Sequence, residues 1–463
     1  MITADYGSTD LKDLEAIKPN KKEKRPPTSS LLVVLLQGVM QVGGFTAIIP
    51  TATMYVKAVG GSASTAGWLV GITALGTGLM QPFLGYPLKH YRLKTLMLAL
   101  CGFNFVGWIL YALGDLSGSL ATIMVARVIT GLAGGPTWLS TYVARSTSTE
   151  LRSHYMQYVS LSVGLGYGIG PFIGGALYAI CSSLDCDGKV FNKYTSPGWL
   201  WAVFAVVVAV LLQTFMVEPP VAKKPNALGG APSPAQTGIP WDRILPILPI
   251  VFAVPLNVGS WEVHTAMLAE TRFGWSVVAT ALYLGGLNVV AAPTGLLPVS
   301  NYVEDRRGCL LFFGAMIAGT VFFWSYKLNI ASRAVVYGVG AVVFLIGAQF
   351  AKAQRPRPNL NTPSPRRRPE IHASMSSQGF GWALVSKQPP PIHRSYVMAC
   401  NAGAYMLGRG TGATVAGYLP PGDAFAIWLV AIDAAAILYI LLLWNRLTVP
   451  KENNSSESTH VPA

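Results

Sequence analysis

Long uninterrupted apolar stretches dominate this 463-residue chain and restrict what it can fold into. A run of about 20 apolar residues spans the hydrocarbon core of a bilayer as a helix, and such runs recur between residues 31 and 445. Charged residues make up only 12% of the chain, about half the share found in soluble domains. Backbone groups in lipid must satisfy their hydrogen bonds within the segment. The sequence therefore predicts an all-α integral membrane protein.

We place twelve transmembrane helices, each end to within about four residues, and they form two groups of six. The first group lies at residues 31–57, 65–88, 94–114, 118–142, 155–181 and 198–217. The second lies at residues 244–269, 275–300, 309–328, 332–351, 395–419 and 424–445.

A polar linker rich in proline, glycine and lysine separates the two groups at residues 218–242. The predicted organisation is then an N-terminal tail (1–30), a six-helix bundle (31–217), the linker, a second six-helix bundle (243–446) and a C-terminal tail (447–463). A basic loop at residues 353–380, for which we expect disorder, interrupts the second bundle.

Most of the 34 lysine and arginine residues fall in alternate connections between the predicted helices. Positive residues collect on the cytosolic side of membrane proteins. This pattern predicts that both tails and the 353–380 loop are cytosolic. The net charge of +14 then reflects attraction to an anionic inner leaflet rather than to nucleic acid.

A gapless internal match relates the fifth predicted helix to the eleventh. Residues 165–177 (LGYGIGPFIGGAL) align with residues 407–419 (LGRGTGATVAGYL), and four glycines and both end leucines coincide. The fifth helix of one group and the fifth of the other run in the same direction. The match therefore predicts a parallel repeat of six helices, with a pseudo-two-fold axis along the membrane normal.

Three motifs resemble the major facilitator superfamily, and the resemblance covers nearly the whole chain. Residues 166–175 (GYGIGPFIGG) resemble a fifth-helix motif frequent in its antiporters, and residues 127–134 (RVITGLAG) resemble its fourth-helix arginine motif. Residues 85–94 (GYPLKHYRLK) resemble its gating loop, with Lys89 where an aspartate is usual. The gating and packing residues implied are Gly85, Lys89, Arg92, Gly131, Gly166, Gly170, Pro171, Gly174, Gly175, Gly408 and Gly412.

Within that superfamily, short segments resemble the branch of lysosomal ceroid-lipofuscinosis-type proteins and SPX-type vacuolar transporters. These segments are residues 50–57 (PTATMYVK), residues 261–262 (WE) and residues 273–276 (FGWS). No SPX domain fits in the first 30 residues, so phosphate sensing does not carry over. The resemblance implies a lysosomal, vacuolar or other endomembrane location, with the plasma membrane as the alternative.

Charged side chains inside the predicted helices are candidates for function, because an intramembrane charge costs at least about 2.5 kcal/mol. Arg127 lies in the fourth helix and Arg409 in the eleventh. Glu262 in the seventh helix could accept a proton, and Asp433 in the twelfth could do the same. Ion pairs that only hold helices together are the alternative for each, and His264 is expected to be a packing residue or to lie at the lumenal edge.

The resemblance implies that the first, fourth, seventh and tenth helices surround a substrate cavity. Polar side chains on these helices extend the set of candidates, with interhelical hydrogen bonding as the alternative for each. The predicted substrate and coupling residues are Gln37, Gln41, Arg127, Thr130, Asn257, Glu262, Tyr337 and Arg409.

No cofactor, metal or catalytic motif occurs, so we expect neither an enzyme nor a nucleic-acid partner. Cys181 and Cys186 form either a disulfide or two free thiols in the outer compartment. The predicted function is a monomeric secondary transporter that moves a small, anionic solute and couples it to protons. A passive anion channel and a membrane sensor or scaffold that does not transport are the alternatives.

Overall fold

A computed structural model describes residues 25–135, 137–219, 239, 241–291, 305–324, 330–350, 394–420 and 423–443. Helices fill nearly all of these ranges, and a single isolated β-bridge joins Asp187 to Asn192. The 353–380 loop, the C-terminal tail and most of the N-terminal tail and of the 218–242 linker lie outside the described residues.

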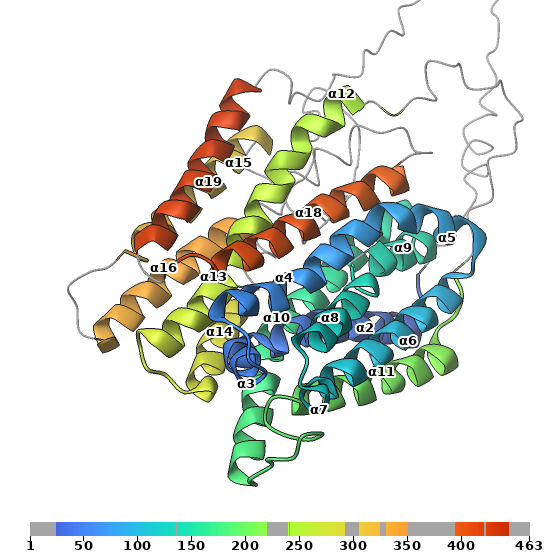
Figure 1. The fold of residues 1–463 in the computed structure, drawn as a ribbon. Coiled ribbons are helices and arrows are strands. Elements are labelled where there is room, and N and C mark those ends of the chain that lie inside the picture. Colours follow the sequence, from blue (N-terminus) through green and yellow to red (C-terminus); the bar gives the residue numbers. More distant parts are fainter. Residues whose placement is uncertain are drawn as a thin grey trace, which may run out of the picture.

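The N-terminal half contains a helix or a helix pair at each of its six predicted positions (Figure 1). The first crossing is α2 (Thr28–Ala47) and α3 (Ala52–Ala58), joined by a 3-10 turn at Pro50, which cannot donate a backbone hydrogen bond. The others are α4 (Ala63–Met80) with α5 (Gly85–His90), α6 (Leu93–Ala112), α8 (Leu120–Leu132) with α9 (Thr137–Ser146), α10 (Thr149–Ser183) and α11 (Ser196–Phe215). The short α7 (Gly114–Ser117) connects α6 to α8.

The C-terminal half repeats this series after the short α12 (Trp241–Ile244). Its six crossings are α13 (Leu248–Thr271), α14 (Val277–Ala291), α15 (Asp305–Val321), α16 (Ile330–Phe350), α18 (Arg394–Ala416) and α19 (Asp423–Leu442). Each of these helices overlaps the predicted range within the described part of the chain. The predicted all-α fold of twelve helices is therefore confirmed.

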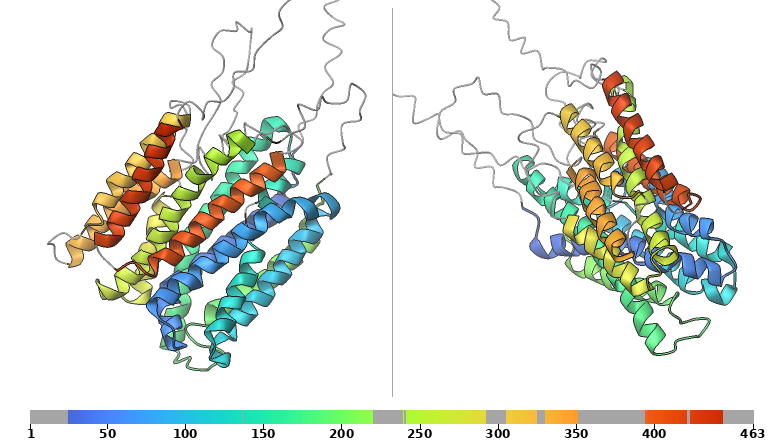
Figure 2. Two further views of the ribbon diagram at one scale, coloured as in Figure 1. Left: turned by 45° about the horizontal axis from the view of Figure 1, so that its top comes forward. Right: turned by 90° about the vertical axis from the view of Figure 1, so that its left-hand side faces the viewer.

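Helix pairing follows a pseudo-two-fold relation between the halves (Figure 2). In the N-terminal half α10 packs on α2, and α6 packs on both α8 and α11; in the C-terminal half α18 packs on α13, and α15 packs on both α16 and α19. Across the halves, α10 packs on α14 and α18 packs on α4. These contacts of the first half thus have counterparts in the second, as the internal repeat predicts.

Seven helical stretches in the described ranges are long and apolar enough to cross a membrane, and α14, α15 and α16 hold shorter apolar helices. The glycine-rich helices α4 and α18 belong neither to the seven long apolar stretches nor to the three shorter ones. Each lies against the other half of the molecule, where a small side chain allows closer contact than a bulky apolar one.

Glycines lie on two faces of α10, and each face packs against a different helix. A Cβ atom added at Gly166 would lie 2.8 Å from the Cβ of Val42 on α2, within the same half. One added at Gly168 would lie 2.5 Å from Val289 on α14, in the other half. The same arrangement occurs on α18, where Gly408 faces α13 and Gly410 faces α4. Both faces therefore require backbones to approach without side chains between them.

Gly170→Leu is expected to prevent stable folding. A Cβ atom at Gly170 would lie 2.5 Å from the Gly43 carbonyl oxygen and would overlap the Thr46 hydroxyl, so α10 would have to move away from α2. Overpacking of this kind costs about 1–3 kcal/mol or more. Membrane abundance and the thermal midpoint of the purified protein measure the effect. Gly102→Leu, on an open face of α6, is the matched control, and equal stability of the two variants would contradict this account.

Candidate functional site

A buried ion pair joins α13 to α18. One terminal nitrogen of Arg409 lies 2.5 Å from both carboxylate oxygens of Glu262, and each side chain is only 3% exposed. Charges removed from water need a partner, because an isolated buried ion costs several kcal/mol. The Nε atom of Arg409 has no hydrogen-bond partner among the described residues. The guanidinium therefore keeps an N–H donor at Nε that no described residue uses.

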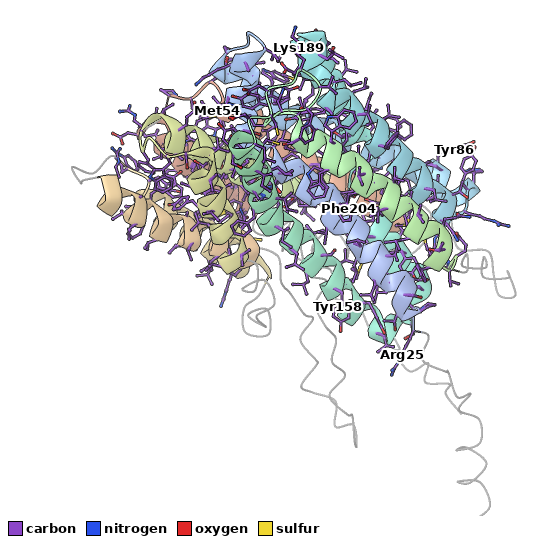
Figure 3. The ribbon with its side chains drawn as sticks, turned by 90° about the horizontal axis from the view of Figure 1, so that it is seen from below. Arg25, Met54, Tyr86, Tyr158, Lys189 and Phe204 are labelled. Carbon is purple, nitrogen blue, oxygen red and sulfur yellow. The ribbon has the colours of Figure 1, made fainter. Side chains whose placement is uncertain are left out.

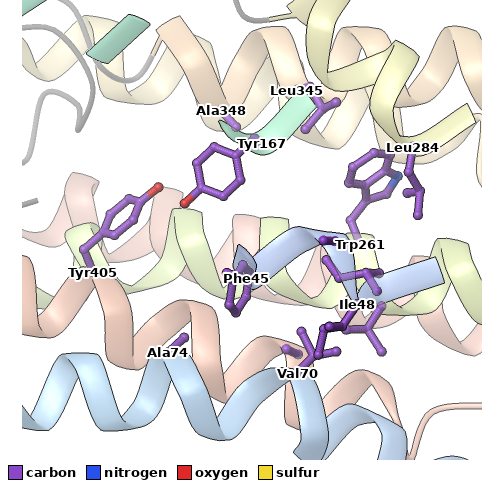
Figure 4. Packing of buried hydrophobic residues seen from close by; sticks show 14 of the residues in the cluster. Phe45, Ile48, Val70, Ala74, Tyr167, Trp261, Leu284, Leu345, Ala348 and Tyr405 are labelled. Carbon is purple, nitrogen blue, oxygen red and sulfur yellow. The ribbon is translucent and has the colours of Figure 1, made fainter. Parts of the chain in front are cut away.

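Aromatic side chains from the N-terminal half cover the Arg409 guanidinium. Its central carbon lies 5.3 Å from the ring centre of Phe45 on α2 and 4.2 Å from that of Tyr167 on α10. Such cation–π contacts are stronger where water is excluded. The hydroxyl groups of Tyr167 and of Tyr405, one helical turn before Arg409, point toward one another (Figure 4). The ion pair of the C-terminal half thus lies at its junction with the N-terminal half.

Small residues explain how two charged side chains meet at this depth. A Cβ atom at Gly259 would overlap the Arg409 carbonyl oxygen, and one at Gly412 would overlap the Leu256 carbonyl oxygen. The two backbones are therefore in direct contact on both sides of the ion pair. Glu262 lies three residues after Gly259, on the same face of α13, and so reaches Arg409 directly.

Arg127 lies inside the N-terminal half, away from this ion pair. Its side chain is fully buried, its Nε atom donates to the Leu69 carbonyl oxygen on α4 at 3.4 Å, and its guanidinium lies 5.2 Å from the Trp108 ring centre on α6. Thr130 donates its hydroxyl to the Arg127 carbonyl oxygen. The structure therefore does not bring Arg127 together with Glu262.

The two glutamines of α2 also point into the N-terminal half. Gln37 donates to the Met97 carbonyl oxygen on α6 at 3.5 Å. Gln41 donates to the Ala133 carbonyl oxygen at 3.1 Å, where the helix breaks between α8 and α9. A helix break in lipid leaves carbonyl oxygens without partners, so the Gln41 amide stabilises the broken helix.

The remaining polar candidates make contacts within the C-terminal half. Asn257 donates to a carboxylate oxygen of Asp433 at 2.6 Å, which ties α13 to α19. Tyr337 on α16 shares a hydrogen bond of 2.9 Å with Thr265. His264 stacks on Phe425, with ring centres 3.6 Å apart. Contact of Asn257 or Tyr337 with a substrate stays a prediction.

Sequence reasoning missed the aromatic part of the site. Phe45, Tyr167 and Tyr405 were not among the predicted residues, although Tyr167 occupies the position of Arg409 in the internal repeat. A residue close to the pseudo-two-fold axis lies next to its own repeat mate. That relation was available from the alignment and would have paired Tyr167 with Arg409.

At the predicted outer end, two contacts join the halves. The Lys57 ammonium on α3 lies 2.9 Å from the Glu270 carboxylate at the end of α13, and Trp68 on α4 donates to the Tyr418 hydroxyl at 2.9 Å. Figure 3 shows this end near Met54, with Tyr158 and Arg25 at the opposite end of the molecule.

The gating-loop motif forms α5 and the start of α6. The Glu218 carboxylate accepts hydrogen bonds from the backbone N–H groups of Leu93 and Lys94, so it caps the positive end of α6. Arg92 is exposed, and the Lys89 side chain lies outside the described residues. Gly85 lies near Tyr396 of α18, in the other half.

Cys181, near the end of α10, and Cys186, which follows the helix, are thiols in this structure. The Cys186 N–H donates to the Cys181 carbonyl oxygen at 2.9 Å, which places the two residues together at the end of α10. In the described part of the chain, no group of three His, Cys, Asp or Glu side chains could hold a metal ion.

The chain is similar in sequence to one known protein family and to several known membrane proteins. A family model of the Major Facilitator Superfamily matches residues 34–362. An uncharacterized MFS-type transporter of Schizosaccharomyces pombe is 24% identical, over 92% of this chain and 90% of its own length. An SPX domain-containing membrane protein of Oryza sativa is 21% identical, over 90% of this chain and 64% of its own length. The predicted resemblance to the superfamily and to its SPX-type members is confirmed.

Solved structures show the same fold. A D-xylose–proton symporter matches with a TM-score of 0.63 and 15% identity, over 91% of this chain and 98% of its own. A bacterial homologue of the human lysosomal transporter Spinster, in an inward-facing and occupied conformation, matches with a TM-score of 0.60 and 16% identity. That match covers 90% of this chain and 95% of the homologue.

Loss of either member of the central ion pair should destabilise the protein more than loss of both. Arg409→Met leaves the Glu262 carboxylate buried without its cation, and Glu262→Leu leaves the Arg409 guanidinium buried without its anion. Removal of one partner costs about 3–5 kcal/mol, whereas apolar replacement of both is close to neutral. Thermal unfolding of the two single variants and the double variant measures the coupling. Additive losses of stability would show that the two side chains do not depend on each other.

Proposed function

From the premise that the chain belongs to the Major Facilitator Superfamily, we propose that it is a secondary transporter carrying a small anionic solute together with protons. It acts as a carrier, not as an enzyme. The observation that supports this proposal most directly is the Glu262–Arg409 pair, covered by Phe45 and Tyr167 of the other half. A carboxylate and a cation at the junction of the halves provide one site for a proton and one for an anion.

The two sites are linked because they share the Arg409 charge. While Glu262 is ionised, its carboxylate is bound to the Arg409 guanidinium. An anionic solute must then compete with that carboxylate for the cation. Protonation of Glu262 removes the carboxylate charge, and the buried guanidinium then favours an incoming anion, since a charge-assisted hydrogen bond is about twice as strong as a neutral one. One proton and one monoanion together leave the charge of the site unchanged. This linkage supports transport of both in the same direction.

Alternating access would act on this site through its aromatic cover. Carriers of this fold rock one six-helix half against the other around a site near the midplane. Phe45 and Tyr167 belong to one half and Arg409 to the other, so rocking changes the contacts of the guanidinium. The Lys57–Glu270 and Trp68–Tyr418 contacts support assignment of this structure to a state closed at the outer end.

The proposed setting is an endomembrane with both termini in the cytosol and the protein acting as a monomer. Basic residues in alternate connections support the orientation. The sequence resemblance to lysosomal ceroid-lipofuscinosis-type proteins and SPX-type vacuolar transporters supports a vacuolar or lysosomal membrane, and SPX domain-containing membrane proteins are among the relatives.

Glu262→Gln should retain exchange of solute between equal compartments and lose accumulation driven by a pH gradient. The amide imitates the protonated carboxyl group but cannot release a proton. Arg409→Gln should impair both activities, because it removes the partner of the anion. Reconstituted liposomes separate the two activities, with a substrate found by screening organic and inorganic anions.

Asp185→Asn, on an exposed outer loop, is the matched carboxylate control and should behave as the wild type. Undiminished pH-driven accumulation in Glu262→Gln would remove this residue from the coupling. Ohmic currents without concentrative uptake would instead identify a passive anion channel. The absence of any flux across a full anion screen would favour a sensor or scaffold.

A further inference from the structure

Among the residues that the structure describes, the buried Arg127 cation has no carboxylate partner. Its relative exposure is 0%, and both terminal nitrogens lack a hydrogen-bond partner among the described residues. Between residues 25 and 219 the carboxylate residues are Asp115, Glu150, Asp185, Asp187 and Glu218. None of them belongs to α4, α6 or α8, the helices that surround Arg127.

Two of these carboxylates have other partners at the ends of the helices. Asp115, on α7, accepts a hydrogen bond of 2.7 Å from the Asn192 amide of the outer loop. Glu218 caps α6 at its opposite end. Arg127 contrasts with Arg409, whose charge Glu262 balances. A fully buried guanidinium with no anion costs several kcal/mol, so its environment calls for a negative charge.

A second unpartnered donor lies beside Arg127. Tyr111 on α6 has 0% exposure, and its hydroxyl has no partner in the described part of the chain. Its backbone carbonyl oxygen already accepts the Tyr55 hydroxyl. Trp108 packs edge-on against the Tyr111 ring and also contacts the Arg127 guanidinium. Two guanidinium NH2 groups and a phenol O–H thus occur together in an aromatic, water-excluding environment.

We propose that Arg127 and Tyr111 hold a bound inorganic monoanion of the halide class inside the N-terminal half. The set of unpartnered groups contains donors and a positive charge, which suit an anion and not a cation. A buried site lined by aromatic rings favours a weakly hydrated monoanion over a divalent anion, because dehydration of the latter costs more. A water molecule could satisfy the hydrogen bonds but not the charge.

This site is separate from the transport site and has a different role. The ion is resident and stabilises the N-terminal half, whereas the proposed solute binds at Arg409 between the halves. The inference therefore does not depend on the proposed function.

The test measures the stability of the purified full-length protein against anion identity at constant ionic strength. Replacement of gluconate by chloride or bromide should raise the thermal midpoint saturably, by about 2–5 °C at concentrations far above the dissociation constant. Sulfate should give little or no rise. Tyr111→Phe, which removes one donor and keeps the ring, should shift the half-saturating chloride concentration upward by about 10–100-fold, the effect of one hydrogen bond to a charged group.

Arg127→Gln should abolish the chloride dependence, and binding of radioactive chloride to the wild type provides a readout that survives if this variant fails to fold. Arg409→Gln should keep the chloride effect while it loses transport, which separates the two sites. Equal thermal midpoints of the wild type in gluconate and chloride, with no bound chloride, would overturn the proposal. Chloride dependence that persists unchanged in Tyr111→Phe and Arg127→Gln would place the ion elsewhere and overturn it as well.

Discussion

Direct contact between helix backbones is the constraint on which the rest of this structure depends. In lipid there is no hydrophobic force to drive one apolar helix against another, so association relies on close van der Waals packing and polar contacts. Glycines supply that closeness on two faces of α10 and on two faces of α18. One face of each helix fixes it within its own half, and the other forms the junction between the halves. The central ion pair exists because its two helices approach this closely.

The two halves balance their buried charge by different means. In the C-terminal half, Arg409 is paired with Glu262, so the counter-charge is a side chain of the protein itself. In the N-terminal half, Arg127 has aromatic neighbours and a single backbone acceptor. The two buried arginines therefore differ in the groups next to their charge: a carboxylate at Arg409, and aromatic rings with one carbonyl oxygen at Arg127. A duplicated fold permits this, because each copy can change its polar side chains while the glycine contacts are kept.

Most of the fold could be predicted from sequence, whereas the site could be predicted only in part. Helix positions follow from local apolar runs, and the repeat follows from glycines that the packing requires in both halves. Contacts of polar side chains depend on helix rotation, which the apolar pattern does not determine because these helices are apolar on all sides. Gln41 contacts a helix break between α8 and α9, and Asn257 contacts Asp433 on a helix distant in sequence. Neither partner could be chosen without the three-dimensional arrangement.

The contact between Tyr167 and Arg409 bears on how such a chain could have arisen. The two residues occupy equivalent positions of the repeat, and in space they touch across the pseudo-two-fold axis at 4.2 Å. In a symmetric dimer of identical six-helix subunits, the same residue would have to face itself there, and two arginines at that separation would repel each other in a medium of low dielectric constant. Fusion of the two copies into one gene removes that restriction. The asymmetric cation at the axis therefore requires two copies that differ in sequence, which fusion of the duplicated halves into one chain provides.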